Sequence, residues 1–60
     1  MKIKIYHDMI HNRLITEQQF RNMALGYVMG LQAEGRVELP SVEEVMLNMD
    51  EIVYLGEVRL

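Results

Sequence analysis

The sequence predicts a small α+β domain spanning residues 1–60, with its elements in the order β-α-α-β. Three observations predict this class: an alternating segment at the N-terminus, a long segment with helix start and stop signals, and a run of β-forming residues at the C-terminus. Of the residues, 50% are hydrophobic and 25% are charged, which is typical of a folded globular domain. We therefore expect one domain with a long central helix, a short second helix and two terminal strands.

The first element is a short strand from Lys2 to Tyr6, where charged and apolar residues alternate. Alternation is the period of a strand with two different faces, so Ile3 and Ile5 face one way and the lysines the other. Lysines also suit the edge of a sheet, because they discourage pairing with other chains. A first helix over residues 4–12, followed by a polar corner, is the alternative for this segment.

The central helix is expected over about residues 17–34, because both of its ends are marked. Thr16 and Gln19 have the spacing of a capping box, in which each side chain hydrogen-bonds to the backbone of the other residue. Gly35 supplies the left-handed conformation that ends many helices. At about 100° per residue, the stripe that faces the core consists of Phe20, Met23, Ala24, Tyr27, Val28 and Leu31.

A second apolar surface runs along the opposite side of the same helix. Leu25, Met29 and Ala33 recur every four residues and form a ridge, with Gly26 and Gly30 beside it. A glycine inside a helix costs about 0.5–1 kcal/mol relative to alanine, and a pair at this spacing lets two backbones approach closely. We therefore expect these five residues to form an interface with a second copy or with another protein. The alternative is that the rest of the chain covers both sides of the helix.

Two further elements follow the central helix. Ser41 begins a second capping box and predicts a short helix over about residues 42–49. Residues 51–60 are rich in β-forming residues and predict the C-terminal strand, in which Gly56 indicates a bulge or a turn. A short extended piece around Val37 would lie between the two helices.

A chain of 60 residues supports only a thin hydrophobic core, because it buries about 60% of the surface that it exposes when unfolded. Small domains usually gain stability from disulfides, a metal or association. The chain has no cysteine, so association is the favoured route and we expect a homodimer. The longest apolar run, Met23 to Leu31, is far shorter than the roughly 20 residues needed to cross a membrane. We expect a cytoplasmic protein without a signal peptide or membrane contact.

The basic residues indicate an alternative function, which is DNA binding by a small dimeric regulator. Residues 1–30 carry four basic and two acidic residues, whereas residues 31–60 carry two basic and seven acidic ones. A first helix over residues 4–12, followed by the central helix, would mimic a helix-turn-helix motif. The net charge of −3 makes nucleic acid an unfavoured partner, because DNA affinity depends on several contacts between basic side chains and phosphates. The candidate contacts are Lys2, Lys4, Arg13 and Arg21.

The segment HDMIH at residues 7–11 places two histidines four residues apart and resembles a degenerate zinc metalloprotease motif. In that motif a glutamate acts as the base, whereas Asp8 is one methylene shorter and reaches less far. Moreover, if residues 2–7 form a strand, the two histidines do not lie on one face of a helix. We therefore expect solvated polar residues at a corner of the chain, and no metal site.

The sequence contains none of the residue patterns that are typical of enzymes, so we expect a protein without catalytic activity. The chain has no cysteine nucleophile, no glycine-rich phosphate loop and no Ser–His pair in a motif context, so we expect neither catalytic residues nor a cofactor. A compact module that binds itself and another protein fits the helix with two apolar sides. Small acidic proteins of this kind are common as accessory or regulatory factors, including in mobile elements.

Overall fold

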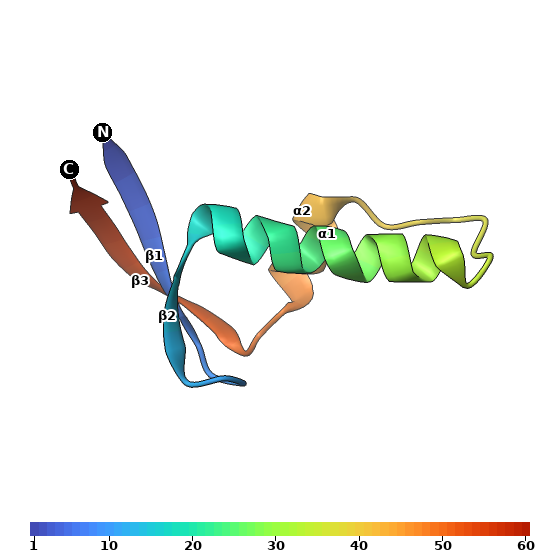
Figure 1. Ribbon diagram of the computed structural model, residues 1–60, viewed down its shortest axis with the longest axis horizontal. Coiled ribbons are helices and arrows are strands. Elements are labelled where there is room, and N and C mark those ends of the chain that lie inside the picture. Colours follow the sequence, from blue (N-terminus) through green and yellow to red (C-terminus); the bar gives the residue numbers. More distant parts are fainter.

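The computed structural model describes residues 1–60 and contains three strands and two helices. These elements are β1 (Lys2–Asp8), β2 (Arg13–Thr16), α1 (Glu17–Ala33), α2 (Val42–Asn48) and β3 (Ile52–Arg59). The expected α+β class with its strand, helix, helix, strand order is confirmed, and β2 is an additional strand before the first helix. Figure 1 shows that both helices lie on one side of the sheet, and that the two chain ends lie together at one end of β1 and β3.

The three strands form one sheet in the order β2-β1-β3, with β1 in the centre. Both strand pairs are antiparallel, so residues directly opposite each other point to the same face. Tyr6 lies opposite Tyr54 and Ile5 lies opposite Gly56, which leaves Leu55 as an extra residue in β3. This β-bulge confirms the irregularity expected at Gly56, whose φ of 146° favours glycine.

A hairpin joins β1 to β2, and no helix forms in residues 4–12. The alternative of a first helix over this segment is therefore wrong. The turn is held by Asp8, whose Oδ1 accepts hydrogen bonds from the backbone N–H groups of Ile10 (3.0 Å) and His11 (3.2 Å). Asn12 completes the turn with a φ of 50°, a left-handed conformation that asparagine tolerates better than most residues.

α1 begins and ends at the signals that the sequence carries. At its start, the Gln19 N–H donates to Thr16 Oγ1 (3.2 Å) and the Thr16 N–H donates to Gln19 Oε1 (2.8 Å), which confirms the capping box. At its end, Gly35 has a φ of 85° and the backbone closes with the two hydrogen bonds of a Schellman motif. The helix therefore ends at Ala33, one residue before the expected end.

α2 is the short helix expected before the C-terminal strand, and it begins at a cap made by Ser41. The Glu44 N–H donates to Ser41 Oγ (3.1 Å), which is one half of the expected capping box. The helix ends at Asn48, one residue earlier than expected. Between the two helices Val37 is 97% exposed and belongs to no strand, so the extended piece around it does not join the sheet.

The core is small and lies between the helix side of the sheet and the first turns of α1. Ile15, Phe20 and Ile52 form its central cluster. The Tyr6 ring packs against the Phe20 ring with a centroid distance of 5.0 Å in an edge-to-face arrangement. Only six of the 60 residues are buried, so this core is as thin as the chain length implies.

The stripe predicted for the core side of α1 is most deeply buried in its first half. Phe20 and Ala24 are buried, but Tyr27 is 57% exposed, so its assignment to the core is wrong. The half-buried members of the stripe are Met23, Val28 and Leu31. Beyond Ala24 the helix extends away from the sheet, so the strands no longer contribute side chains to cover it (Figure 1).

The molecule is longer and has more surface than a compact chain of its size. Its radius of gyration is 12.8 Å, whereas a compact domain of this length has about 10 Å. Its accessible surface is 4660 Å², compared with about 4,100 Å² for a typical folded monomer of 7.1 kDa. Two parts of the molecule remain uncovered, namely the side of α1 that carries Leu25 and Met29 and the side of the sheet without helices (Figure 1).

Candidate interaction surfaces

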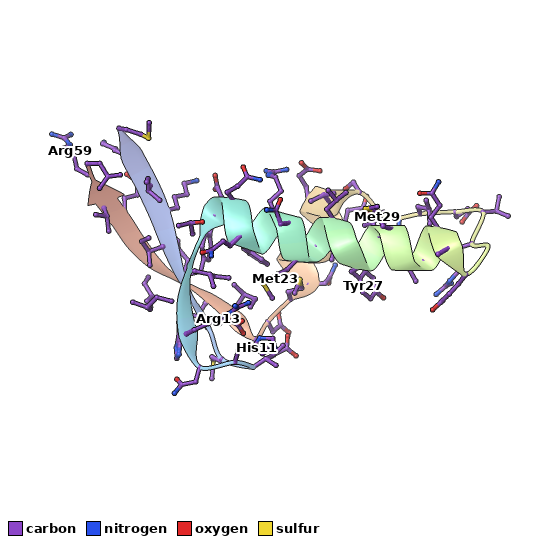
Figure 2. The ribbon with its side chains drawn as sticks, in the orientation of Figure 1. His11, Arg13, Met23, Tyr27, Met29 and Arg59 are labelled. Carbon is purple, nitrogen blue, oxygen red and sulfur yellow. The ribbon has the colours of Figure 1, made fainter.

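The five residues expected to form an interface lie together on the side of α1 opposite the buried Phe20 and Ala24. Within this ridge, Leu25 is 44% exposed and Met29 is 59% exposed. A methyl group added at Gly26 would meet no atom within 4 Å, and the same holds at Gly30. Neither glycine therefore serves packing inside this chain. The ridge is an open apolar surface on the protruding half of α1, where Figure 2 shows the Met29 side chain.

A second open surface is the side of the sheet that carries no helix. Tyr6 and Asp8 point towards the helices, so the alternation along β1 turns Ile3, Ile5 and His7 to the other side. Residues directly opposite these three in register share that side. We call this surface the outer sheet face, and it consists of Ile3, Ile5, His7, Leu14, Thr16, Val53, Gly56 and Val58.

The outer sheet face is apolar and contains no Asp, Glu, Lys or Arg. Leu14 is 67% exposed and Val58 is 47% exposed, because no other element packs on this side. The titratable member is His7, which is half-buried and has its Nε2 atom 3.2 Å from Asn12 Oδ1. A contiguous exposed apolar patch of this kind is typical of an interaction site.

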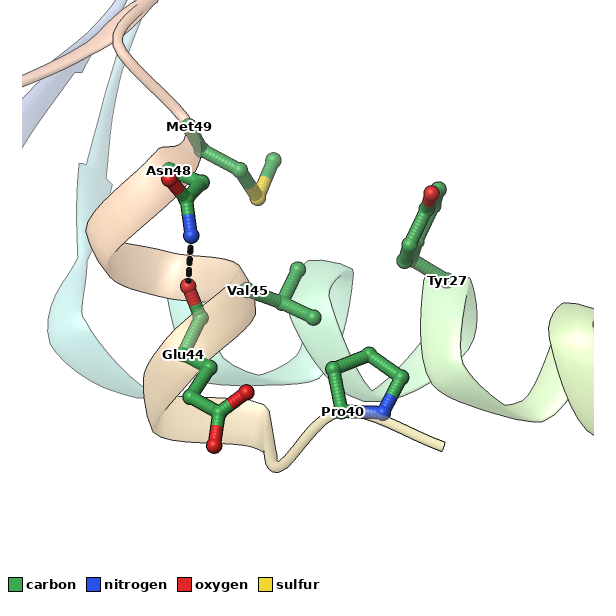
Figure 3. A pocket seen from close by; sticks show the side chains of 6 residues that line it. All are labelled: Tyr27, Pro40, Glu44, Val45, Asn48 and Met49. Carbon is green, nitrogen blue, oxygen red and sulfur yellow. Dashed lines mark hydrogen bonds between the residues drawn. The ribbon is translucent and has the colours of Figure 1, made fainter. Parts of the chain in front are cut away.

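Two open hollows flank α2 on the helix side of the molecule. The first has a volume of about 390 Å³ and lies between the two helices, with Tyr27 across from Val45 and Met49 (Figure 3). The second has a volume of about 460 Å³ and lies between α2, the start of α1 and the sheet. In the second hollow the charges of Arg21 and Glu43 offset each other. Neither hollow brings a nucleophile, an acid and a base together.

Asp8 is the one fully buried charged side chain, and it organises the β1–β2 hairpin. Its Oδ2 accepts hydrogen bonds from His11 Nδ1 (2.8 Å) and Arg13 Nε (3.1 Å), both of which lie on the helix side of the hairpin (Figure 2). Burial by itself raises the pKa of the Asp8 carboxyl. The hydrogen bonds from His11 and Arg13 outweigh burial and lower that pKa from 3.8 to about 2. The carboxylate is thus a structural anchor with every hydrogen bond satisfied.

The two histidines of the 7–11 segment do not converge on one site. His7 belongs to the outer sheet face, whereas His11 bonds to Asp8 on the helix side. No group of three or more His, Cys, Asp or Glu side chains lies close enough to share a metal ion. The spacing that resembles a metalloprotease motif therefore belongs to a strand and a turn, and the histidines do not lie on a common helical face.

The four basic residues considered for DNA binding do not form a free basic patch. Three of them pair with carboxylates of the same chain; the pairs are Lys4–Glu17 (3.5 Å), Arg13–Asp8 (3.1 Å) and Arg21–Glu43 (2.8 Å). A helix-turn-helix motif also needs a helix before α1, and the chain has β1 and a turn there. The chain therefore does not form the helix-turn-helix arrangement considered for residues 4–34.

The Arg21–Glu43 pair joins the two helices at the surface. The hydrogen bond from Arg21 lowers the pKa of the Glu43 carboxyl, and the same bond raises the pKa of Arg21. Both side chains are more than 40% exposed, so water screens the pair and it contributes little to stability.

The outer sheet face is the surface that sequence reasoning did not assign as an interface, although the alternation at residues 2–6 contains it. Alternation separates the two sides of a strand, but it does not say which side the helices will cover. β2 was not predicted, since its four residues run directly into the start of α1. The available signal was Asn12, a residue that favours turns, directly before a short run of β-forming residues.

No helix of this chain combines the length and the apolar character needed to span a membrane. Comparison with known proteins shows no relative: no family model matches the chain, and neither a curated protein nor a solved structure is significantly similar to it. The two open apolar surfaces are therefore the features from which a function can be argued.

Proposed function

We propose that this chain is a non-catalytic protein–protein interaction module that works as a homodimer and modulates another protein. The observation that carries the proposal is a pair of apolar surfaces, the ridge of α1 and the outer sheet face, that nothing in the chain covers. Exposed apolar patches on small proteins mark sites of interaction. Neither surface holds polar groups in an arrangement suited to catalysis.

The energetics of a small chain also favour association. Only six residues are buried and the chain has no disulfide, so a single copy has few of the usual sources of stability. A standard interface buries about 800 Å² on each partner, and removing apolar surface from water stabilises by about 25 cal/mol per Å². The surface of this protein exceeds that of a typical monomer by roughly 600 Å², which is of the same order.

The ridge of α1 suits a partner protein with an apolar groove or helix. Met29 has a flexible side chain that adapts to different surfaces. Gly26 and Gly30 lie beside it with open space above them, so a partner backbone can approach closely. The ridge lies on the protruding half of α1, where a partner meets no obstruction from the sheet (Figure 1).

Sedimentation equilibrium at concentrations from about 1 to about 100 μM tests the homodimer. We expect a species of twice the monomer mass of 7.1 kDa. A single species of 7.1 kDa at about 100 μM would contradict the proposal, because it limits the association free energy to roughly −5.5 kcal/mol.

The partner is tested by capture from the native host with the immobilised wild-type chain, followed by titration of each purified candidate. The Met29→Lys variant places a charge on the ridge, and we expect it to lose binding. Leu47→Lys is the matched control, since Leu47 is 82% exposed on α2 and lies outside the ridge. A partner that binds wild type and Met29→Lys equally well would show that the ridge is not its site.

A further inference from the structure

We infer that two copies of this chain associate face to face through their outer sheet faces, so that a two-layer sheet packing encloses a shared apolar core. This inference rests on the proposed homodimer and names the surface that forms it. Two sheets packed in this way lie about 10 Å apart, and their facing side chains interdigitate. The helices of both copies then lie on the outside of the dimer.

The direction of the side chains in the sheet is the first support. Ile3 and Ile5 point away from the helices, and the residues opposite them in β3 are Val58 and Gly56. The helix side of the same strand ends carries the charged residues Lys2, Lys4, Glu57 and Arg59. At this end, the sheet thus turns its charged residues to the helix side and its apolar residues Ile3, Ile5 and Val58 to the open side. That distribution is unfavourable for a monomer and favourable for a sandwich of two sheets.

The absence of acidic and strongly basic residues from the outer sheet face is the second support. A symmetric dimer places the same patch of each copy against its counterpart, so a charge near the axis would meet an identical charge. The outer sheet face contains no Asp, Glu, Lys or Arg, and a second copy meets no repulsion there. The charged residues of β1 and β3 remain in solvent on the other side of the sheet.

The area of uncovered surface is the third support. The accessible surface of 4660 Å² is roughly 600 Å² larger than that of a typical monomer of this mass. A stable dimer needs about 800 Å² from each copy. The excess belongs to the whole molecule, and the outer sheet face is one of the two uncovered parts that contribute to it.

The ridge of α1 is less suited to pairing two copies. Its continuation towards the helix start consists of Gln18 and Asn22, whose side chains hydrogen-bond to each other (3.0 Å) at the surface. The apolar part is therefore narrow and limited to the protruding half of the helix. Self-association through the sheet leaves the ridges of both copies free for another protein.

Four variants with the same change of charge locate the dimer surface. Leu14→Lys and Val58→Lys alter side chains of the outer sheet face that are well exposed in a single copy, so the monomer tolerates them. Met29→Lys alters the ridge, and Leu47→Lys alters an exposed position on α2. The dimer dissociation constant is measured by sedimentation equilibrium, and far-ultraviolet circular dichroism checks the fold.

We expect Leu14→Lys and Val58→Lys to raise the dissociation constant by about 100-fold, because each would bury two unpaired charges in the dimer. Met29→Lys and Leu47→Lys should keep the wild-type constant. Folded Leu14→Lys and Val58→Lys variants that dimerise like wild type would overturn the sheet interface and leave the proposed homodimer standing. A monomeric wild type would overturn both.

A measurement on the wild-type chain covers the case in which a lysine variant does not fold. Methyl spectra recorded by nuclear magnetic resonance during dilution report which side chains leave an interface. We expect the methyl signals of Ile3 and Val58 to shift with dilution and those of Leu25 on the ridge to stay constant. A shift confined to Leu25, or no shift at all, would overturn the inference.

Discussion

The two faces of the three-stranded sheet have very different surroundings. On the helix side, Ile15 and Ile52 pack around Phe20, and the buried Asp8 carboxylate has every hydrogen bond satisfied. On the outer sheet face the side chains are just as apolar, yet Leu14 is 67% exposed. The difference shows that apolar character alone does not decide burial in a small chain. The side on which α1 leaves β2 decides which face is covered.

The largest expected effect lies in the covered core. Phe20→Ala should lower the free energy of unfolding by about 3–5 kcal/mol, because it leaves a cavity beside Ile15 and Ile52. Val58→Ala on the outer sheet face should cost far less in dilute solution, since Val58 is already 47% exposed there. Urea unfolding monitored by circular dichroism measures both values. If the two variants lost the same free energy of unfolding in dilute solution, the outer sheet face would be as well covered as the core, and the comparison would be wrong.

A smaller loss of stability is expected when Asp8, the buried carboxylate of the β1–β2 hairpin, is replaced. Asp8→Asn removes the charged acceptor from His11 and Arg13 and turns an amide N–H₂ towards other donors, so the melting temperature should fall. The pKa of the Asp8 carboxyl is about 2 in the folded chain and has its ordinary value of 3.8 in the unfolded chain. Its stabilisation is therefore complete above pH 3.8 and is lost as the pH falls towards 2.

Thermal melts between pH 7 and pH 2 check this dependence. The melting temperature of the wild type should fall as the Asp8 carboxylate becomes protonated, and Asp8→Asn lacks this contribution. The melting temperatures of the two proteins should therefore converge at the lowest pH. Parallel loss of stability in both proteins would assign the acid sensitivity to other carboxylates.

Loss of the cap at the start of α1 should have a smaller effect on the free energy of unfolding. Thr16→Ala removes the acceptor for the Gln19 N–H and should cost about 1 kcal/mol. Thr16→Ser keeps the hydroxyl and serves as the control. Both variants are compared with wild type by urea unfolding, and an alanine variant as stable as the serine variant would mean that the cap contributes nothing.

The smallest expected effect has the opposite sign. Gly30→Ala should stabilise the chain by about 0.5–1 kcal/mol, because a methyl group there meets no atom and alanine is the better helix former. Its dimer dissociation constant should equal that of wild type if the sheet forms the dimer. A Gly30→Ala variant that is more stable yet monomeric would move the dimer interface to α1.

Much of the fold follows from local signals in the sequence. The ends of α1 were predictable because Thr16, Gln19 and Gly35 act within one turn of the backbone that they cap. The bulge at Gly56 was predictable for the same reason, since a glycine among β-forming residues marks a backbone irregularity. Such signals depend on neighbours in sequence, and the structure satisfies them with shifts of one residue at most.

The two open apolar surfaces were only partly predictable from the sequence. The ridge with Leu25 and Met29 follows from helical periodicity, and the structure leaves it open. The outer sheet face depends instead on the pairing of β1 with β2 and β3, which no local pattern specifies. Tyr27 was misplaced for a similar reason, because it faces the open hollow between α1 and α2, and no local pattern specifies how closely α2 packs on α1.

The β-bulge at Leu55 limits how far an assembly of this chain can grow. β3 is an edge strand, and a straight edge of its length would add further strands and template a fibre. The extra residue interrupts the row of hydrogen-bonding groups and increases the local twist. The opposite edge, β2, has only four residues and offers little to pair with. With both edges blunted, we expect no growth along the sheet and therefore a small particle instead of a filament.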